Sequence, residues 1–319
     1  MSSYRHHLPQ LDDRVFLTDS GLETTLIFLE GHELPYFAAF DLLKEAAGRA
    51  VLRNYFRRHI TLAREHGLGF ILESATWRAN PDWAAKLGYT PADLNRANRD
   101  AITFLQKLRD EFEAEQTPMV VSGCIGPRGD GYKADARMTA AEAEAYHAPQ
   151  AQVFAEAGAD LVSAITMTYS EEAMGITRAA RAANLPVVIS FTVETDGRLP
   201  SGESIAEAIN AVDAATASAP AYYMINCAHP THFTGALERN ESWVQRIRGI
   251  RANASRKSHA ELDQATELDI GNPDELGELY GALRNDFSHF TILGGCCGTD
   301  HRHIKAICTA CAPRGRTPA

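Results

Sequence analysis

The feature that most constrains the fold is an alternation of short apolar runs with helical stretches along nearly the whole chain. The clearest run, residues 186–193 (Pro-Val-Val-Ile-Ser-Phe-Thr-Val), is β-branched and continuous, which is typical of a strand buried on both faces. Further strands are predicted at residues 14–18, 69–72, 118–124, 160–167, 222–226, 249–253 and 290–293. Helices are predicted between and after them at residues 42–66, 91–115, 139–157, 171–183, 204–218, 236–248, 274–283 and 301–311.

Repeated strand-then-helix units predict a parallel sheet of the α/β class. Eight such units close into a (β/α)₈ TIM barrel, whose functional site lies at the carboxyl ends of the strands. We therefore expect one barrel domain over residues 1–311 and a disordered tail over residues 312–319. A doubly wound open sheet is the alternative.

Composition narrows the class of protein. The chain has 319 residues, long enough for two average domains or one large barrel, and 45% of them are hydrophobic. No apolar run approaches the ~20 residues of a membrane helix, and the first residues lack the apolar segment of a secretory signal. A net charge of −10 argues against nucleic-acid binding. Six unevenly placed cysteines do not make a disulfide framework, so a reducing, cytoplasmic location is expected.

Cysteines mark two of the predicted strand ends. Cys296 and Cys297 lie in a Gly-Gly-Cys-Cys-Gly segment directly after the last strand, and Cys227 follows the strand at residues 222–226. Adjacent side chains on a strand point to opposite faces, so the pair reaches one ion only if the backbone turns, which the glycines permit. Three thiolates suit Zn²⁺, and a free fourth position is typical of a catalytic site. Small buried residues or a Cys296–Cys297 disulfide remain alternatives.

Several segments together resemble the homocysteine S-methyltransferase family, which includes betaine- and S-methylmethionine-dependent enzymes and the homocysteine domain of cobalamin-dependent methionine synthase. They are residues 19–24 (Asp-Ser-Gly-Leu-Glu-Thr), 123–127 (Gly-Cys-Ile-Gly-Pro), 226–227 (Asn-Cys) and 294–298. The resemblance covers nearly the whole chain. It implies a zinc-dependent barrel in which Cys227, Cys296 and Cys297 are the metal ligands.

The resemblance also implies roles for substrate-binding residues. Asp19 matches an aspartate near the amino-acid substrate, and Asn253 an asparagine that fills the metal's fourth position in some members. One position departs from the family: after the fourth strand a glutamate usually holds the substrate's ammonium group, whereas this chain has Ile-Thr-Met-Thr around Thr166. Glu73 and Glu194 are candidate replacements; otherwise the acceptor is a thiol other than homocysteine.

The expected reaction is methyl transfer to a zinc-bound thiol. The donor should be a cation with a good leaving group, either a sulfonium such as S-methylmethionine or S-adenosylmethionine, or betaine. Aromatic faces bind such cations, and Trp77, Trp83 and Tyr132 are candidates, although packing of the loops is the competing explanation. We expect small-molecule partners only, with methionine as product, and leave the donor and homo-oligomerisation open.

Other motifs favour structural roles. The glycine-rich segment 126–131 lacks a P-loop lysine pattern and is interpreted as a lid. His229 is expected to be a solvated loop residue, with metal ligation as the alternative. Cys124, Cys308 and Cys311 are expected in the core. A barrel that holds zinc without catalysing a reaction is the rival from another class, and metal-assisted hydrolysis is disfavoured by the thiolate ligands.

Overall fold

The computed structural model describes residues 4–12, 14–135 and 137–311. The predicted disordered tail, 312–319, lies outside the described residues. Within them, eight parallel strands form a closed barrel in chain order, and β1 pairs with β8 to close it. The strands are β1 (Phe16–Leu17), β2 (Gly69–Glu73), β3 (Met119–Ile125), β4 (Leu161–Met167), β5 (Val187–Phe191), β6 (Tyr222–Asn226), β7 (Ile247–Ala252) and β8 (Ile292–Gly295). The predicted single-domain (β/α)₈ barrel is confirmed.

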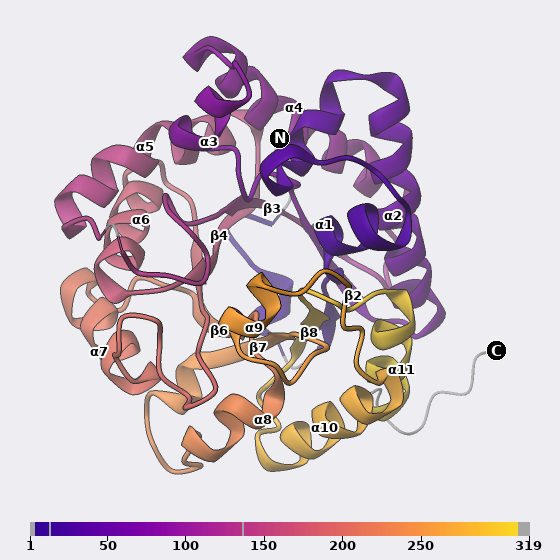
Figure 1. Ribbon diagram of the computed structural model, residues 1–319, viewed down its shortest axis with the longest axis vertical. Coiled ribbons are helices and arrows are strands. Elements are labelled where there is room, and N and C mark those ends of the chain that lie inside the picture. Colours follow the sequence, from indigo (N-terminus) through magenta and orange to yellow (C-terminus); the bar gives the residue numbers. More distant parts are fainter. Residues whose placement is uncertain (1–3, 13, 136, 312–319) are drawn as a thin grey trace.

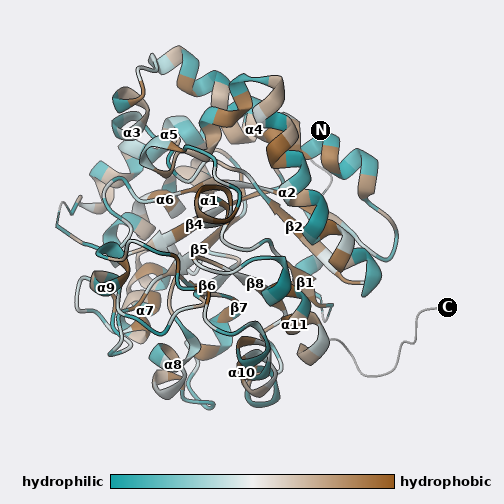
Figure 2. Cartoon of the chain, turned by 45° about the vertical axis from the view of Figure 1, so that its right-hand side comes forward, coloured by the Kyte–Doolittle hydropathy of each residue, from teal (hydrophilic) through white to brown (hydrophobic). Residues whose placement is uncertain are grey.

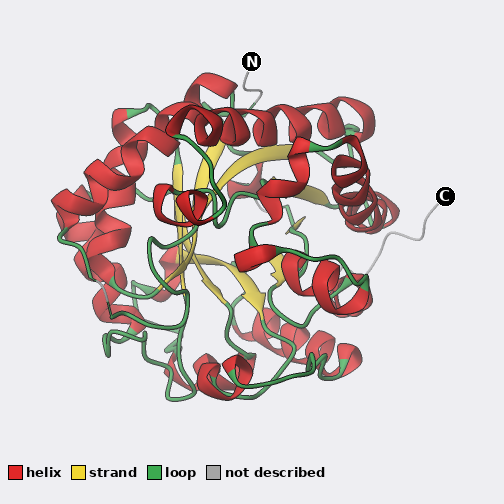
Figure 3. Cartoon of the chain, turned by 45° about the horizontal axis from the view of Figure 1, so that its top comes forward, coloured by secondary structure: helices red, strands yellow, loops and turns green. Residues whose placement is uncertain are grey.

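Helices surround the strands (Figures 1 and 3). The longer ones are α2 (Ala46–Glu65), α4 (Pro91–Phe112), α5 (Ala140–Ala157), α6 (Ser170–Ala182), α7 (Ile205–Thr216), α10 (Pro273–Asp286) and α11 (His301–Cys311). The short ones are α1 (Leu22–Thr24), α3 (Pro81–Lys86), α8 (Pro230–Phe233) and α9 (His259–Asp263). Among the described helices, none combines the length and hydropathy needed to cross a membrane.

Strand side chains alternate between the barrel interior and the helices, because successive residues of a strand point to opposite faces. One cluster fills the interior: Leu8, Phe16, Ile71, Val120, Cys124, Leu161, Ile165, Val188, Tyr222, Met224 and Ile292. The opposite set, including Leu17, Phe70 and Ile225, joins the large core under the helices. In Figure 2 hydrophobic colours accordingly concentrate on the strands and the inward faces of the helices. The mouth at the strands' carboxyl ends is left for polar residues.

Two sequence predictions were wrong in the chain between β6 and α10. The helix predicted at residues 236–248 is absent; the segment instead contains the 3₁₀ turns Thr234–Ala236 and Val244–Arg246, and β7 already begins at Ile247. The apolar residues of this segment, Leu237, Trp243 and Val244, have a spacing compatible with a helix. In the structure their side chains are buried, but the backbone forms irregular turns on either side of the polar stretch 240–242. Tertiary packing of these three side chains therefore outweighs local helical propensity. Between the strand predicted at residues 249–253 and the helix predicted at residues 274–283, where no element is predicted, the structure has the short helix α9.

Candidate active site

Three cysteine sulfur atoms converge at the barrel mouth. Cys227 follows β6, and Cys296 and Cys297 follow β8; their Sγ atoms all lie within 4.8 Å of one another. The Sγ of Cys227 is 2.9 Å from that of Cys296 and 3.6 Å from that of Cys297. All three cysteines are free thiols, so the predicted alternative of a Cys296–Cys297 disulfide is not found. Within the described residues, no histidine or carboxylate joins this group.

Unusual backbone geometry brings the three sulfurs together. Cys227 has a φ of 56°, a left-handed conformation that is uncommon for a residue other than glycine. After β8 the chain turns, with the Thr299 amide donating to the Cys296 carbonyl at 3.1 Å and Gly298 at a φ of 79°. Gly21 fits against this turn because a Cβ there would lie 2.5 Å from the Cys296 carbonyl oxygen. The turn therefore presents two adjacent cysteines to one point.

Tyr132 and His259 cover the sulfur group. The Tyr132 hydroxyl lies 3.5 Å from Cys297 Sγ and 3.7 Å from Cys227 Sγ. Its ring stacks on His259 of α9, with centroids 4.1 Å apart. His259 Nε2 is 2.7 Å from the Cys227 carbonyl oxygen, and its Nδ1 is 2.9 Å from a Glu194 carboxylate oxygen. Glu194 is thus engaged in positioning α9 over the site.

Asn226 ties three strand ends together beside the sulfurs. Its Oδ1 accepts from the Thr166 amide at 3.0 Å and from the Ser190 hydroxyl at 2.6 Å. Its Nδ2 donates to Thr166 Oγ1 at 2.8 Å and lies 3.8 Å from Cys296 Sγ. Thr166 has a φ of 67°, an outlier for a β-branched residue, and the β4–β5 register shifts there. The Thr166 hydroxyl is therefore already hydrogen-bonded to Asn226.

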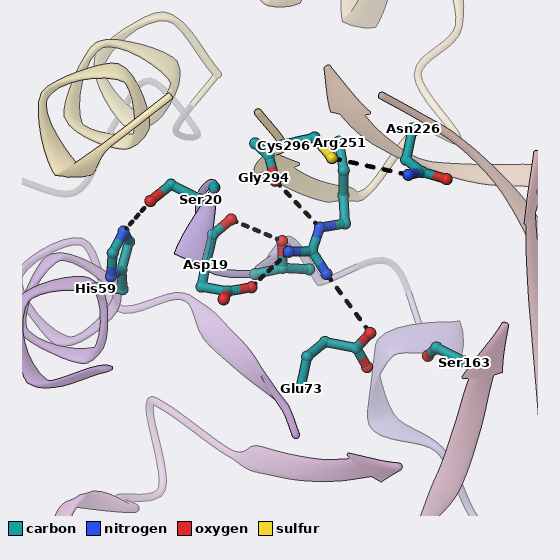
Figure 4. A network of polar contacts seen from close by, with 12 residues as sticks. Asp19, Ser20, His59, Glu73, Ser163, Asn226, Arg251, Gly294 and Cys296 are labelled. Carbon is teal, nitrogen blue, oxygen red and sulfur yellow. Dashed lines mark hydrogen bonds and ion pairs between the residues drawn. The ribbon is translucent and has the colours of Figure 1, made fainter. Parts of the chain in front are cut away.

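A buried charge network lies beneath the sulfurs (Figure 4). Arg251 of β7 pairs with Asp19 at 2.6 Å and Glu73 at 3.5 Å, and its Nε donates to the Gly295 carbonyl at 3.3 Å. Tyr55 also donates to Asp19, at 3.2 Å. Burial raises the pKa of both carboxyl groups, and Arg251 opposes that shift. Two of the acids predicted to bind substrate are therefore engaged by a buried arginine that the sequence analysis did not identify.

The protonation of the sulfurs is uneven. Hydrogen bonding to Cys227 and Cys297 lowers the pKa of Cys296, against the effect of burial and with help from the positive charge of Arg251. Hydrogen bonding to Cys296 and burial raise the pKa of Cys227. Burial, followed by the charges of the three cysteines, raises the pKa of Tyr132, so its hydroxyl remains a donor.

The geometry of the group fits a metal ion. Sulfur ligands at the Zn–S distance of ~2.3 Å in a tetrahedral site lie about 3.8 Å apart. The separation of 3.6 Å between Cys227 and Cys297 is close to that value, while Cys227 and Cys296 at 2.9 Å are nearer. Asn253 donates from Nδ2 to the Cys227 carbonyl at 3.0 Å, and its Oδ1 is buried without a hydrogen-bond partner. That orphaned oxygen is consistent with a ligand beside Cys227.

The remaining sequence-predicted residues have structural contacts. His229 is buried, contrary to the expectation of a solvated residue, and caps α8 by accepting from the Thr231 amide at 3.3 Å. Cys124 is buried in the barrel interior, and Cys308 and Cys311 lie in the core under the helices, which confirms their predicted placement.

Two of the three aromatic faces proposed for a cationic donor, those of Trp77 and Trp83, already carry cations of the protein. The Arg78 guanidinium lies 4.1 Å from the Trp77 ring centroid and 4.0 Å from that of Trp83. Lys86 Nζ lies 3.8 Å from the Trp83 centroid. The Trp77 indole donates to the Ile165 carbonyl at 3.2 Å. Arg78 was missed because a lone loop arginine carries no sequence signal of its own.

The family model described as Homocysteine S-methyltransferase matches residues 16–311. The chain belongs to the homocysteine S-methyltransferase family.

Relatives of this family member differ widely in length. The Escherichia coli (strain K12) Homocysteine S-methyltransferase is 23% identical over 265 residues, covering 73% of this chain and 77% of that protein. The Mycobacterium tuberculosis (strain ATCC 25618 / H37Rv) Methionine synthase is 32% identical over 141 residues, which are 43% of this chain and 11% of that protein. The chain thus matches about a tenth of the length of the methionine synthase.

Solved structures share the fold. The oxidized form of the Homocysteine Methyltransferase MmuM from Escherichia coli superimposes with a TM-score of 0.74 at 20% identity, covering 96% of this chain and 99% of that one. Its metallated form gives a TM-score of 0.71 at 20% identity, with 95% and 98% covered. This likeness concerns the barrel architecture.

Proposed function

We propose that the protein is a zinc-dependent thiol methyltransferase that moves a methyl group from a sulfonium donor, S-methylmethionine or S-adenosylmethionine, to homocysteine or a close analogue, giving methionine in the first case. The observation that carries the proposal is the convergence of the Cys227, Cys296 and Cys297 sulfurs within 4.8 Å at the mouth of the barrel. Such a donor set suits Zn²⁺ and leaves a fourth position for substrate.

These three cysteines would hold the metal, which when bound keeps a substrate thiol in its nucleophilic thiolate form. The chain's own residues then position the reactants. Tyr132 donates toward the ligand sulfurs, Asn226 fixes the ends of β4, β5 and β6, and Arg251 offsets negative charge beneath Cys296. In the reaction a bond forms between the substrate sulfur and the methyl carbon as the donor's carbon–sulfur bond breaks. The donor leaves as a neutral thioether, and the thiol proton passes to solvent.

The test is to incubate the zinc-loaded protein with homocysteine and, in turn, S-methylmethionine, S-adenosylmethionine and betaine, and to assay methionine. Turnover with a sulfonium donor supports the proposal, whereas turnover with betaine alone assigns an ammonium donor. If zinc is bound and no donor gives methionine, homocysteine is not the acceptor, and the alternatives are a different thiol or the non-catalytic zinc barrel. Cys297→Ser should lose both zinc and turnover; an active, metal-free Cys297→Ser protein contradicts the mechanism. Cys308→Ser, in α11, is the matched control.

A further inference from the structure

Two residues of opposite charge at the barrel mouth have no role in the site described so far: Glu23 of α1 (Leu22–Thr24) and Arg78 of the loop after β2. β8 pairs with β1, and β1 pairs with β2. The segments that carry Cys296 and Cys297, Glu23 and Arg78 therefore follow three consecutive strands around the rim. A ligand with its sulfur at the cysteines has both charged groups on the same side of the mouth.

Glu23 is held close to the cysteine turn by its neighbours in sequence. The Gly21 amide donates to the Thr299 carbonyl at 3.3 Å, and Thr24 Oγ1 accepts from the Gly298 amide at 3.2 Å. Glu23 itself is only partly buried as a residue. Burial of its carboxyl group, with Asp19 and Cys296 adding negative charge, raises its pKa to about 7, although the positive charge of Arg78 opposes the rise. A cation beside this carboxylate would relieve that repulsion.

Arg78 is fixed by its neighbours and keeps one N–H without an acceptor. It is 8% exposed, stacked against both indoles, and its Nη1 donates to the Gly129 carbonyl at 2.9 Å. Its Nε is buried without a hydrogen-bond partner, which is costly for a charged group and indicates a missing acceptor. Burial lowers its pKa to about 10, so it is still charged at neutral pH. Its partner Gly129 lies in the same loop as Tyr132, whose hydroxyl lies 3.5 Å from Cys297 Sγ, so Arg78 lies at the side of the mouth where this loop meets the sulfurs.

We propose that Arg78 and Glu23 bind the carboxylate and the ammonium of an α-amino-acid substrate whose sulfur lies at the three cysteines. Two unlike charges on adjacent loops match a zwitterion, and a planar guanidinium fits a carboxylate with two parallel hydrogen bonds. This assignment also explains the chain's lack of a carboxylate after β4, where Thr166 is taken up by Asn226. Asp19 and Glu73 are less suitable because Arg251 already pairs with both. The inference rests on the proposed function, since it concerns the same site.

Binding to the zinc-loaded protein, measured by calorimetry, tests the assignment independently of turnover. The probes are homocysteine, 3-aminopropane-1-thiol, which lacks the carboxylate, and 4-mercaptobutanoate, which lacks the ammonium group. Arg78→Met should weaken homocysteine binding about 10- to 100-fold, the usual effect of losing a charge-assisted hydrogen bond, and leave 3-aminopropane-1-thiol unchanged. Glu23→Gln should weaken homocysteine binding similarly and leave 4-mercaptobutanoate unchanged.

Arg53→Met and Glu30→Gln are matched controls, since these residues form exposed ion pairs with Glu111 and Arg58. S-Methylmethionine and trimethylsulfonium, tested in parallel, assign the pair to the donor's amino-acid end if only S-methylmethionine binding falls. Equal losses for all probes, or no loss for any amino acid, overturn the proposal. Selective losses without methyl transfer to any thiol would retain this binding site and refute the proposed reaction instead.

Discussion

At the residue scale, the site depends on side chains that contact the cysteines and not only on the cysteines themselves. Cys227 has a left-handed φ of 56°, and its carbonyl receives contacts from Asn253 at 3.0 Å and His259 at 2.7 Å. A strained backbone of this kind costs about 1–3 kcal/mol and persists only where its surroundings fix it. The contacts to Cys227 supply that restraint.

Tyr132→Phe isolates one of these contacts, because it removes a hydroxyl and keeps the ring that stacks on His259. The hydroxyl lies 3.5 Å from Cys297 Sγ and 3.7 Å from Cys227 Sγ. We expect zinc affinity to fall on the order of tenfold, as for other groups that orient metal ligands. A competition titration with a zinc chelator measures it. Tyr146→Phe, which alters a hydroxyl bonded to Asn80, is the control; equal effects from both variants would contradict the assigned role.

His59 gives a pH prediction. It is 1% exposed, with Nε2 2.8 Å from the Ser20 hydroxyl and Nδ1 3.0 Å from the Tyr55 carbonyl oxygen. Burial lowers its pKa to about 4 from 6.5, and the nearby charges of His301, Arg58 and Asp300 act more weakly. Between these values the unfolded chain binds a proton that the folded chain does not. The free energy of unfolding is therefore unaffected by His59 above pH 6.5. It falls by up to about 3 kcal/mol as the pH drops toward 4, because protonation of His59 then favours the unfolded chain.

Urea unfolding of the metal-free protein at pH 7 and pH 4.5 measures this effect. In His59→Gln the loss of stability on acidification should be smaller by about 2–3 kcal/mol, because glutamine does not titrate. An unchanged acid dependence in the variant would show that His59 does not carry it.

At the element scale, local signals predicted helix starts well, whereas long-range packing decided the failures. The predicted start of α4 at residue 91 is confirmed, and the structure adds the local reason: proline stands at the first position, and Thr90 and Asp93 form a capping box. Residues 236–248 have helix-like apolar spacing. In the structure, however, Trp243 and Val244 lie at the start of a 3₁₀ turn before β7, and their side chains are buried there. Apolar spacing alone, on which both helices were predicted, does not distinguish the two cases. The same limit applies to the site: strand ends located the cysteines, but Arg251, His259 and Arg78 act through contacts between distant segments.

The cap of α4 offers a direct test. Thr90 Oγ1 accepts from the Asp93 amide at 3.2 Å, so Thr90→Ala should lower the free energy of unfolding by about 1 kcal/mol. Thr103→Ala, at an exposed position within the same helix, should not lower it: the exposed side chain contributes little, and the higher helix propensity of alanine acts in the stabilising direction. Chemical denaturation of both variants gives the comparison. Equal effects would mean that the cap contributes nothing specific.

At the scale of the whole molecule, the closed barrel is what makes remote sequence segments adjacent. β6 and β8 flank β7, so Cys227 and the Cys296–Cys297 pair are separated by a single strand at the rim. Arg251, from that intervening β7, reaches across the interior to Asp19 and Glu73 after β1 and at the end of β2. The order of strands could be predicted from the alternation of elements. The pairing of charges across the barrel could not, because it depends on side-chain directions in three dimensions.

Zinc X-ray absorption on the metal-loaded protein, with and without homocysteine, tests the central claim most directly. The account predicts three sulfur neighbours and one lighter neighbour around zinc in the free protein, and four sulfurs once the thiol is bound. Fewer than three sulfurs in the free protein, or an unchanged sulfur count with homocysteine bound, would contradict it.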